Sequence, residues 1–213
     1  MRRYQQMDIA FAAAKGEGCW RHFLEPDFMN HVSREDDISN LRYIKDMFVG
    51  PHINYEVNKC TEIVLPVKFD FKWSTYIWDF SRTKIFVLDP TMHNGDESDK
   101  EIQQRHRKVA DELHRSIELC IKSFFIGWEP DMRRWNTCFP KGLVNGICER
   151  FYLTFFSFFW LFLLVFLYGY LVDRHDVFDP MCRKDTWIYA THLARNWMGT
   201  KLKRDVNPVS IVA

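Results

Sequence analysis

The sequence lacks the cysteine patterns that mark a metal site or a disulfide scaffold. Its 213 residues include six cysteines, which are scattered, with no CxxC pair and no tight cluster of cysteine and histidine. Structural zinc sites and small disulfide-stapled domains both need close, regular spacing. We therefore expect no metal or other cofactor, and we expect reduced thiols in an intracellular compartment.

An excess of charge of either sign is missing as well. Lys and Arg number 29 against 28 for Asp and Glu, a formal net charge of +1. Composition therefore gives no reason to expect a nucleic-acid partner. Residues 1–19 contain basic residues, but their short apolar run is interrupted by Asp8 and Lys15. We interpret this segment as an N-terminal lead and find no secretory signal in it.

One long apolar run departs from this balance. Residues 151–172, FYLTFFSFFWLFLLVFLYGYLV, carry no charge and are long enough to cross a bilayer. Neither flank is decisively basic, so the sequence predicts no orientation. Three interpretations stay open: a membrane span, an apolar helical insertion packed in a core, or translated non-coding sequence. We favour the third, because the pyrimidine tract of a retained intron would encode such a string of Phe, Leu and Ser.

The first half of the chain changes from helical to strand patterns. The stretches CWRHFLEPDFMNHV and DDISNLRYIKDMF predict helices, the second ending at Gly50. EIVLPV then predicts a strand, and its Pro66 favours an edge or a strand end. Residues 73–80 and 84–88 predict a hairpin around the turn Ser-Arg-Thr.

A long amphipathic helix should follow that hairpin. Ser98 with Glu101 offers a capping box for its start, and Gly127 provides a stop. We place His106 and His114 on the solvated side of this helix. Its apolar stripe consists of Ile102, Val109, Leu113, Ile117, Ile121 and Phe124.

The order of these elements resembles that of the Ulp1-like cysteine peptidases, the ubiquitin-like (SUMO-specific) proteases with their divergent plant and transposon-borne members. The matching stretch is IVLPVKFDFKWSTYIWDFSRTKIFVLDP, residues 63–90. In that family a strand ends in a histidine-tryptophan pair, and the aspartate of the catalytic triad follows across the hairpin. The resemblance places Trp73 at the tryptophan and Asp89 at the acid that orients the imidazole. From the residues alone, an aspartate before a proline also reads as the start of a turn.

The same alignment places Lys72 at the histidine position. A Cys–His–Asp peptidase needs a neutral imidazole that takes the thiol proton and returns it to the leaving amine. An ammonium group has no lone pair to accept that proton, and a nearby carboxylate favours the charged form. Lys72 therefore predicts an impaired proton relay.

Two positions compete for the nucleophile. Thr186, between Asp185 and Trp187, precedes a sequence that continues the family pattern through a helix, IYATHLARNW, so we align Thr186 with the catalytic cysteine. Cys148 follows an Asn-Gly pair, as in many relatives, and is the alternative. The glutamine that usually helps form the oxyanion hole is absent about six residues before either one. A threonine hydroxyl without a base is not a competent substitute.

The resemblance implies an α+β, papain-like cysteine peptidase fold, with a central antiparallel sheet flanked by helices and interrupted by the apolar helical insertion. Its first part would span residues 20–144, the insertion 145–181, and the final helix and tail 182–213. The implied reaction is cleavage of peptide or isopeptide bonds after a ubiquitin-like modifier, in an impaired enzyme of the nucleus or cytoplasm.

Two alternatives to an impaired peptidase remain. One is a pseudoprotease that binds a ubiquitin-like modifier or its conjugate, with Trp73 forming an aromatic wall for the extended tail of the modifier. The other is a membrane-anchored protein, whose contact with the membrane would be made by residues 151–172.

Overall fold

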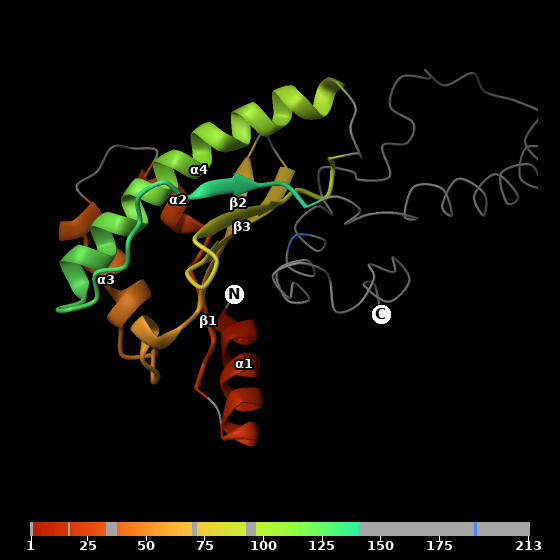
Figure 1. The fold of residues 1–213 in the computed structure, drawn as a ribbon. Helices are drawn as coiled ribbons and strands as arrows, with labels where there is room; N and C mark the ends of the chain where they lie inside the picture. Colours follow the sequence, from red (N-terminus) through yellow and green to blue (C-terminus); the bar gives the residue numbers. More distant parts are fainter. Residues whose placement is uncertain are drawn as a thin grey trace, which may run out of the picture.

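The computed structural model describes residues 2–16, 18–32, 38–69, 72–92 and 97–140, together with Ala190. Their centre is a five-stranded sheet in the order β1-β2-β3-β4-β5 (Figure 1). The three central strands are antiparallel, as predicted, whereas β1 is parallel to β2 and β5 is parallel to β4. The sheet is therefore mixed. Its strands are β1 Arg21–Phe23, β2 Glu62–Phe69, β3 Lys72–Asp79, β4 Lys84–Leu88 and β5 Asn136–Cys138.

The predicted hairpin is confirmed as β3 and β4, and its turn is held by a carboxylate. Asp79 accepts hydrogen bonds from the Ser81 hydroxyl at 2.6 Å and from the Arg82 backbone at 3.0 Å. The Arg82 guanidinium adds an ion pair with Asp79 at 2.6 Å. Thr83 completes the turn with a positive φ of 51°. Local side-chain contacts therefore fix the length of this hairpin.

Pro66 lies in β2, which is an inner strand and not the predicted edge. The Glu62 amide donates to the Trp20 carbonyl, and the Val64 carbonyl accepts from the Leu24 amide. Even-numbered residues of β2 thus direct their backbone groups toward β1. Because the β1–β2 ladder ends at Val64, Pro66 comes where no donor is needed. The prediction of an edge or a strand end was therefore wrong, because the short β1 leaves the Pro66 position without a partner on one side of an inner strand.

One face of the sheet is covered by α4, which runs across it with α2 and α3 near one end (Figure 1). The long helix was predicted, and Gly127 follows it with a φ of +79°. Apolar side chains from the sheet, α2, α3 and α4 form one buried core against this face. The helices are α1 Arg2–Lys15, α2 Asp27–Val32, α3 Arg42–Val49 and α4 Glu97–Phe124, with 3₁₀ turns at Ile38–Asn40 and Val57–Lys59.

The helical prediction for the first fifty residues was correct only in part. The stretch CWRHFLEPDFMNHV contains the short strand β1 before α2 begins at Asp27. Phe23, Leu24 and Phe28 of this stretch are buried, Phe23 within a strand paired with β2 and Phe28 within α2. The second predicted helix is present as α3, and Gly50 caps it.

The apolar run 151–172 lies outside the described residues, as do the boundaries predicted for the insertion. Within the ranges that the structure describes, no helix is long and apolar enough to cross a membrane. From the later part of the chain the structure places Ala190, which is buried. Its carbonyl accepts a hydrogen bond of 2.8 Å from the Thr75 hydroxyl of β3. A residue far along the chain thus contacts the sheet.

Candidate functional site

The aligned acid and the aligned base lie at one end of the β3–β4 hairpin. Lys72 opens β3, and Asp89 directly follows β4. The last pair of the β3–β4 ladder is Thr75 with Leu88, so one further step places Ser74 opposite Asp89. Lys72 comes two residues before Ser74 and, by the alternation of a strand, on the same face of the sheet. The folded hairpin therefore keeps the relative order that the sequence resemblance assigns.

The Asp89 carboxylate is buried and hydrogen-bonded through both of its oxygens. Oδ1 accepts from the Thr91 backbone amide at 2.7 Å and from the Thr91 hydroxyl at 2.8 Å. Oδ2 lies 2.8 Å from Nε2 of His106, a residue of α4. Burial by itself would raise the pKa of Asp89, but the hydrogen bonds from His106 and Thr91 lower it below its usual value. Asp89 is therefore held as a carboxylate.

His106 connects Asp89 to a tyrosine inside the core. Its Nδ1 lies 2.6 Å from the Tyr76 hydroxyl of β3. The ring is surrounded by Phe69, Tyr76 and Phe139, with ring centroids 5.2, 5.8 and 6.3 Å away. Burial raises the pKa of Tyr76 far above its usual value, so the hydroxyl stays protonated. Because the Asp89 carboxylate can only accept, Nε2 of the neutral ring carries the proton, and Nδ1 accepts a hydrogen bond from the Tyr76 hydroxyl. The result is a Tyr76–His106–Asp89 chain that joins β3, α4 and the end of β4.

The prediction that the helix histidines face solvent was wrong. His106 is 1% exposed. His114 is half-buried, accepts a hydrogen bond of 3.1 Å from the Trp78 indole and lies 2.6 Å from the Met132 carbonyl. The spacing could have shown the position of His106, because it falls four residues after Ile102 and three before Val109 on the apolar stripe. What sequence reasoning could not supply was the buried partner that makes a polar residue acceptable there.

His106 and Asp89 have the bonding pattern of a catalytic histidine and its orienting acid, yet His106 cannot act as a general base. With Tyr76 donating to Nδ1 and Nε2–H donating to Asp89, neither nitrogen of His106 has a free lone pair. A protonated ring would donate from both nitrogens and would again accept nothing. A general base must also reach the proton that it removes, and His106 is enclosed by the core. The Tyr76–His106–Asp89 chain is therefore structural.

The other predicted site residues are only partly placed. Lys72 and Trp73 are half-buried neighbours in β3, and the alternation of the strand directs their side chains to opposite faces of the sheet. Trp73 shares its face with Thr75, the residue that contacts Ala190. Cys148 and Thr186 lie outside the described residues. Within the described ranges, no group of three His, Cys, Asp or Glu side chains is arranged to hold a metal ion.

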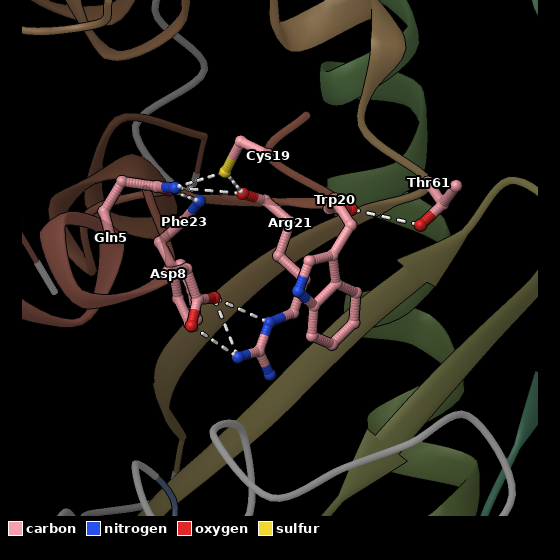
Figure 2. A network of polar contacts seen from close by, with 7 residues as sticks. All are labelled: Gln5, Asp8, Cys19, Trp20, Arg21, Phe23 and Thr61. Atoms are coloured by element: carbon pink, nitrogen blue, oxygen red, sulfur yellow. Dashed lines mark hydrogen bonds and ion pairs between the residues drawn. The ribbon is translucent and has the colours of Figure 1, made fainter. Parts of the chain in front are cut away.

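A second polar cluster lies on the opposite side of β2, next to α1. Arg21 of β1 forms two hydrogen bonds with the Asp8 carboxylate of α1, at 2.8 and 2.9 Å (Figure 2). Glu62 pairs in the sheet with Arg21 on one side and with Asp79 on the other. Its Oε2 is buried without a hydrogen-bond partner. Burial raises the pKa of Glu62 to about 7.

Comparisons with known proteins give one match of low similarity to report. No family model matches the chain, and no curated protein does. Among solved structures, a similar one is the X-ray structure of the C-terminal Ulp1 protease domain in complex with Smt3, the yeast ortholog of SUMO. The two are 15% identical with a TM-score of 0.40, over 87% of this chain and 74% of the other. A likeness this distant does not establish membership of the family.

Proposed function

We propose that the chain is a divergent Ulp1-like domain that binds a ubiquitin-like modifier, or its conjugate, without hydrolysing it. Support for the family comes from the order of residues along the hairpin, in which Lys72 and Trp73 open β3 and Asp89 follows β4. The proposal assigns no cofactor, because hydrolysis in such a family depends on a thiolate, an imidazole and a carboxylate alone.

The single observation that supports loss of hydrolysis is the bonding of Asp89. A triad acid must orient a catalytic imidazole through one of its oxygens. In this chain Oδ2 bonds to the enclosed His106 and Oδ1 bonds to Thr91. Lys72, at the aligned base position, brings an ammonium in place of an imidazole. The chain therefore lacks an imidazole at the aligned base position, and the carboxylate that would orient such an imidazole is already bonded to His106 and Thr91.

Binding of a modifier would use the accessible part of the Trp73 side chain on β3. A half-buried indole on a strand can pack against the extended, glycine-rich tail of a ubiquitin-like protein. Because binding needs shape and hydrogen bonding but no proton relay, it can persist where hydrolysis is lost. Affinity for the modifier and hydrolysis of its conjugate can therefore be measured independently.

The test uses the purified full chain with SUMO and ubiquitin, each in two forms. A form carrying a C-terminal electrophile should give no covalent adduct, because no imidazole activates a thiol. The unmodified form, coupled to resin, should retain the chain, and Trp73→Ala should weaken retention at least fivefold, whereas the exposed-residue control Arg115→Ala should not. An adduct that disappears in Cys148→Ala would contradict the loss of hydrolysis, and absence of retention would contradict binding.

A histidine at position 72 would restore an imidazole at the aligned base position, which tests whether the base is the only catalytic group that is missing. We expect Lys72→His to remain unreactive toward the electrophilic modifiers, because Asp89 stays bonded to His106 and cannot orient the new ring. The matched control is Lys68→His, on the neighbouring strand β2. Labelling that appears only in Lys72→His, and requires Cys148, would show that Asp89 is available after all.

The cell compartment follows from the same proposal. A chain that engages ubiquitin-like modifiers would act in the nucleus or the cytoplasm, where such conjugates form. Fractionation of cells that express the tagged full chain tests this, because a carbonate-resistant membrane pellet would instead favour anchoring by residues 151–172. Release of the chain by carbonate would argue against that anchor.

A further inference from the structure

Two cysteines that the proposed function does not use lie opposite each other where β1 and β2 begin. The first residue pair of the parallel β1–β2 ladder is Arg21 with Glu62. Two residues before that first pair come Cys19 and Cys60. The Trp20 carbonyl accepts from the Thr61 amide at 2.9 Å and from the Thr61 hydroxyl at 3.1 Å, so the two segments stay side by side next to the cysteines (Figure 2 shows the hydroxyl contact). Adjacent strands lie about 4.8 Å apart, within the range of Cα separations that a disulfide spans.

The Cys60 side chain lies directly against the backbone of Cys19. The Cys60 thiol donates to the Cys19 carbonyl at 3.2 Å, and the Cys19 thiol lies 3.1 Å from the Arg21 carbonyl. Both cysteines are buried, at 9% exposure for Cys19 and 5% for Cys60. Figure 2 shows the Gln5 side-chain amide of α1 reaching the Cys19 sulfur, at 3.2 Å. An amide donor aimed at sulfur stabilises a thiolate.

The two thiols are not equivalent chemically. Interaction with the Cys60 side chain lowers the pKa of the Cys19 thiol below its usual value against the opposing effect of burial, and the Gln5 amide adds a smaller lowering. The same interaction, together with burial, raises the pKa of the Cys60 thiol well above its usual value. Cys19 is therefore the better nucleophile, and Cys60 keeps its proton beside it.

We propose that Cys19 and Cys60 form a redox-sensitive pair that a peroxide converts into an intramolecular disulfide. The Cys19 thiolate attacks one peroxide oxygen, the O–O bond breaks, and hydroxide leaves, which oxidises Cys19 to the sulfenic acid. The Cys60 sulfur then attacks the Cys19 sulfur, and the S–O bond breaks with loss of water as the Cys60 proton is taken up. Two thiols and one hydrogen peroxide thus give one disulfide and two waters.

The disulfide would link the segment just before β1 to the segment just before β2. Gln5 contacts both the thiol and the strand, because its amide also donates to the Arg21 carbonyl and accepts from the Phe23 amide at 2.7 Å. Loss of the thiolate removes one of these three contacts between α1 and β1. Oxidation therefore fixes β1 against β2 and loosens α1. This device is independent of whether the chain binds a modifier.

The first test is a peptide map of the full chain after oxidation. The reduced protein is treated with graded hydrogen peroxide, remaining thiols are blocked with N-ethylmaleimide, and peptides are separated without reduction. We expect a linked peptide containing Cys19 and Cys60, lighter by two hydrogens than its two thiol forms, at the lowest effective dose. Cys138, a half-buried cysteine of β5, should remain alkylated. No such link, or links of Cys19 mainly to other cysteines, would overturn the proposal.

Variants assign the order of the two steps. In Cys60→Ser the sulfenic acid on Cys19 has no partner, so dimedone should label Cys19. In Cys19→Ser, dimedone should leave Cys60 unlabelled at the same dose. The control Cys138→Ser should form the same linked peptide as the wild type. Labelling of Cys60 in Cys19→Ser at the same dose would overturn the assigned roles, and the wild-type map decides the proposal if either variant fails to fold.

Discussion

Two buried carboxyl groups of this sheet, Asp89 and Glu62, show opposite behaviour at similar burial. Asp89 is 4% exposed and Glu62 is 5% exposed. The pKa of Asp89 lies below its usual value, whereas that of Glu62 is raised to about 7. Asp89 receives hydrogen bonds from His106 and Thr91, but Glu62 has a buried oxygen without a partner.

In these two residues the supply of hydrogen-bond donors, and not the extent of burial, decides the charge of the carboxyl group. Burial penalises the ionised form of both groups. At Asp89 three donors outweigh that penalty. At Glu62 the nearby charges of Arg21 and Asp79 act in opposite directions, so burial dominates. A buried acid at the end of a hairpin is thus not by itself a catalytic acid, because its donors can come from the core.

The largest expected effect comes from breaking the bonds of Asp89. Asp89→Ala leaves His106 and Thr91 without their buried acceptor, so the free energy of unfolding should fall by about 3–5 kcal/mol. Urea unfolding followed by circular dichroism measures the change. The control is Asp111→Ala, an exposed carboxyl of α4, which should change stability by less than about 0.5 kcal/mol. Equal losses in the two variants would contradict the structural role of Asp89.

A second prediction concerns the pH dependence caused by Glu62. Its pKa is about 7 in the folded chain against an ordinary 4.5, so the folded state binds more protons between these values and stability falls as pH rises through that range. Glu62→Gln removes the cost of ionisation. The variant should match the wild type near pH 4.5 and exceed it above pH 7, by up to about 3 kcal/mol. A difference that does not change with pH would show that Glu62 is not the titrating group.

A smaller loss of stability is expected at Tyr76, the residue farthest from Asp89 in the Tyr76–His106–Asp89 chain. Tyr76→Phe removes the hydroxyl that bonds to His106 Nδ1 and leaves that nitrogen without its partner. Stability should fall by about 1–2 kcal/mol in the same urea measurement. Tyr43→Phe is the matched control, since its exposed hydroxyl donates to Glu25 at 2.8 Å, and we expect almost no change there. No loss in Tyr76→Phe would mean that the Tyr76–His106 bond contributes nothing.

Local patterns made part of the fold predictable from the sequence. Alternating residues and a polar turn gave the β3–β4 hairpin, and the apolar stripe gave α4, because each pattern reflects a single neighbouring element. β1 and β5, of three residues each, were missed because their strand character comes from parallel partners distant in sequence. The mixed sheet could not be predicted for the same reason.

The position of Asp89 after the hairpin was predictable from the sequence, but its bonding was not. The resemblance located Asp89 at the end of the hairpin, and the structure places it there. Its partner is His106 of α4, a residue that we had predicted to lie on the solvated side of that helix. A polar residue on an apolar stripe signals a buried partner, but only the folded core identifies Tyr76 and Asp89 as those partners.

The most direct test of the account is hydrogen exchange at the His106 ring, observed by NMR in protein labelled with ¹⁵N-histidine. The signal is assigned by its disappearance in His106→Gln. We expect an Nε2–H proton that exchanges slowly with solvent, because it is buried and hydrogen-bonded to Asp89, and that exchanges rapidly in Asp89→Asn. An Nε2–H that exchanges in the wild type as fast as that of a surface histidine would contradict it, and Asp89 would then be free to orient another group.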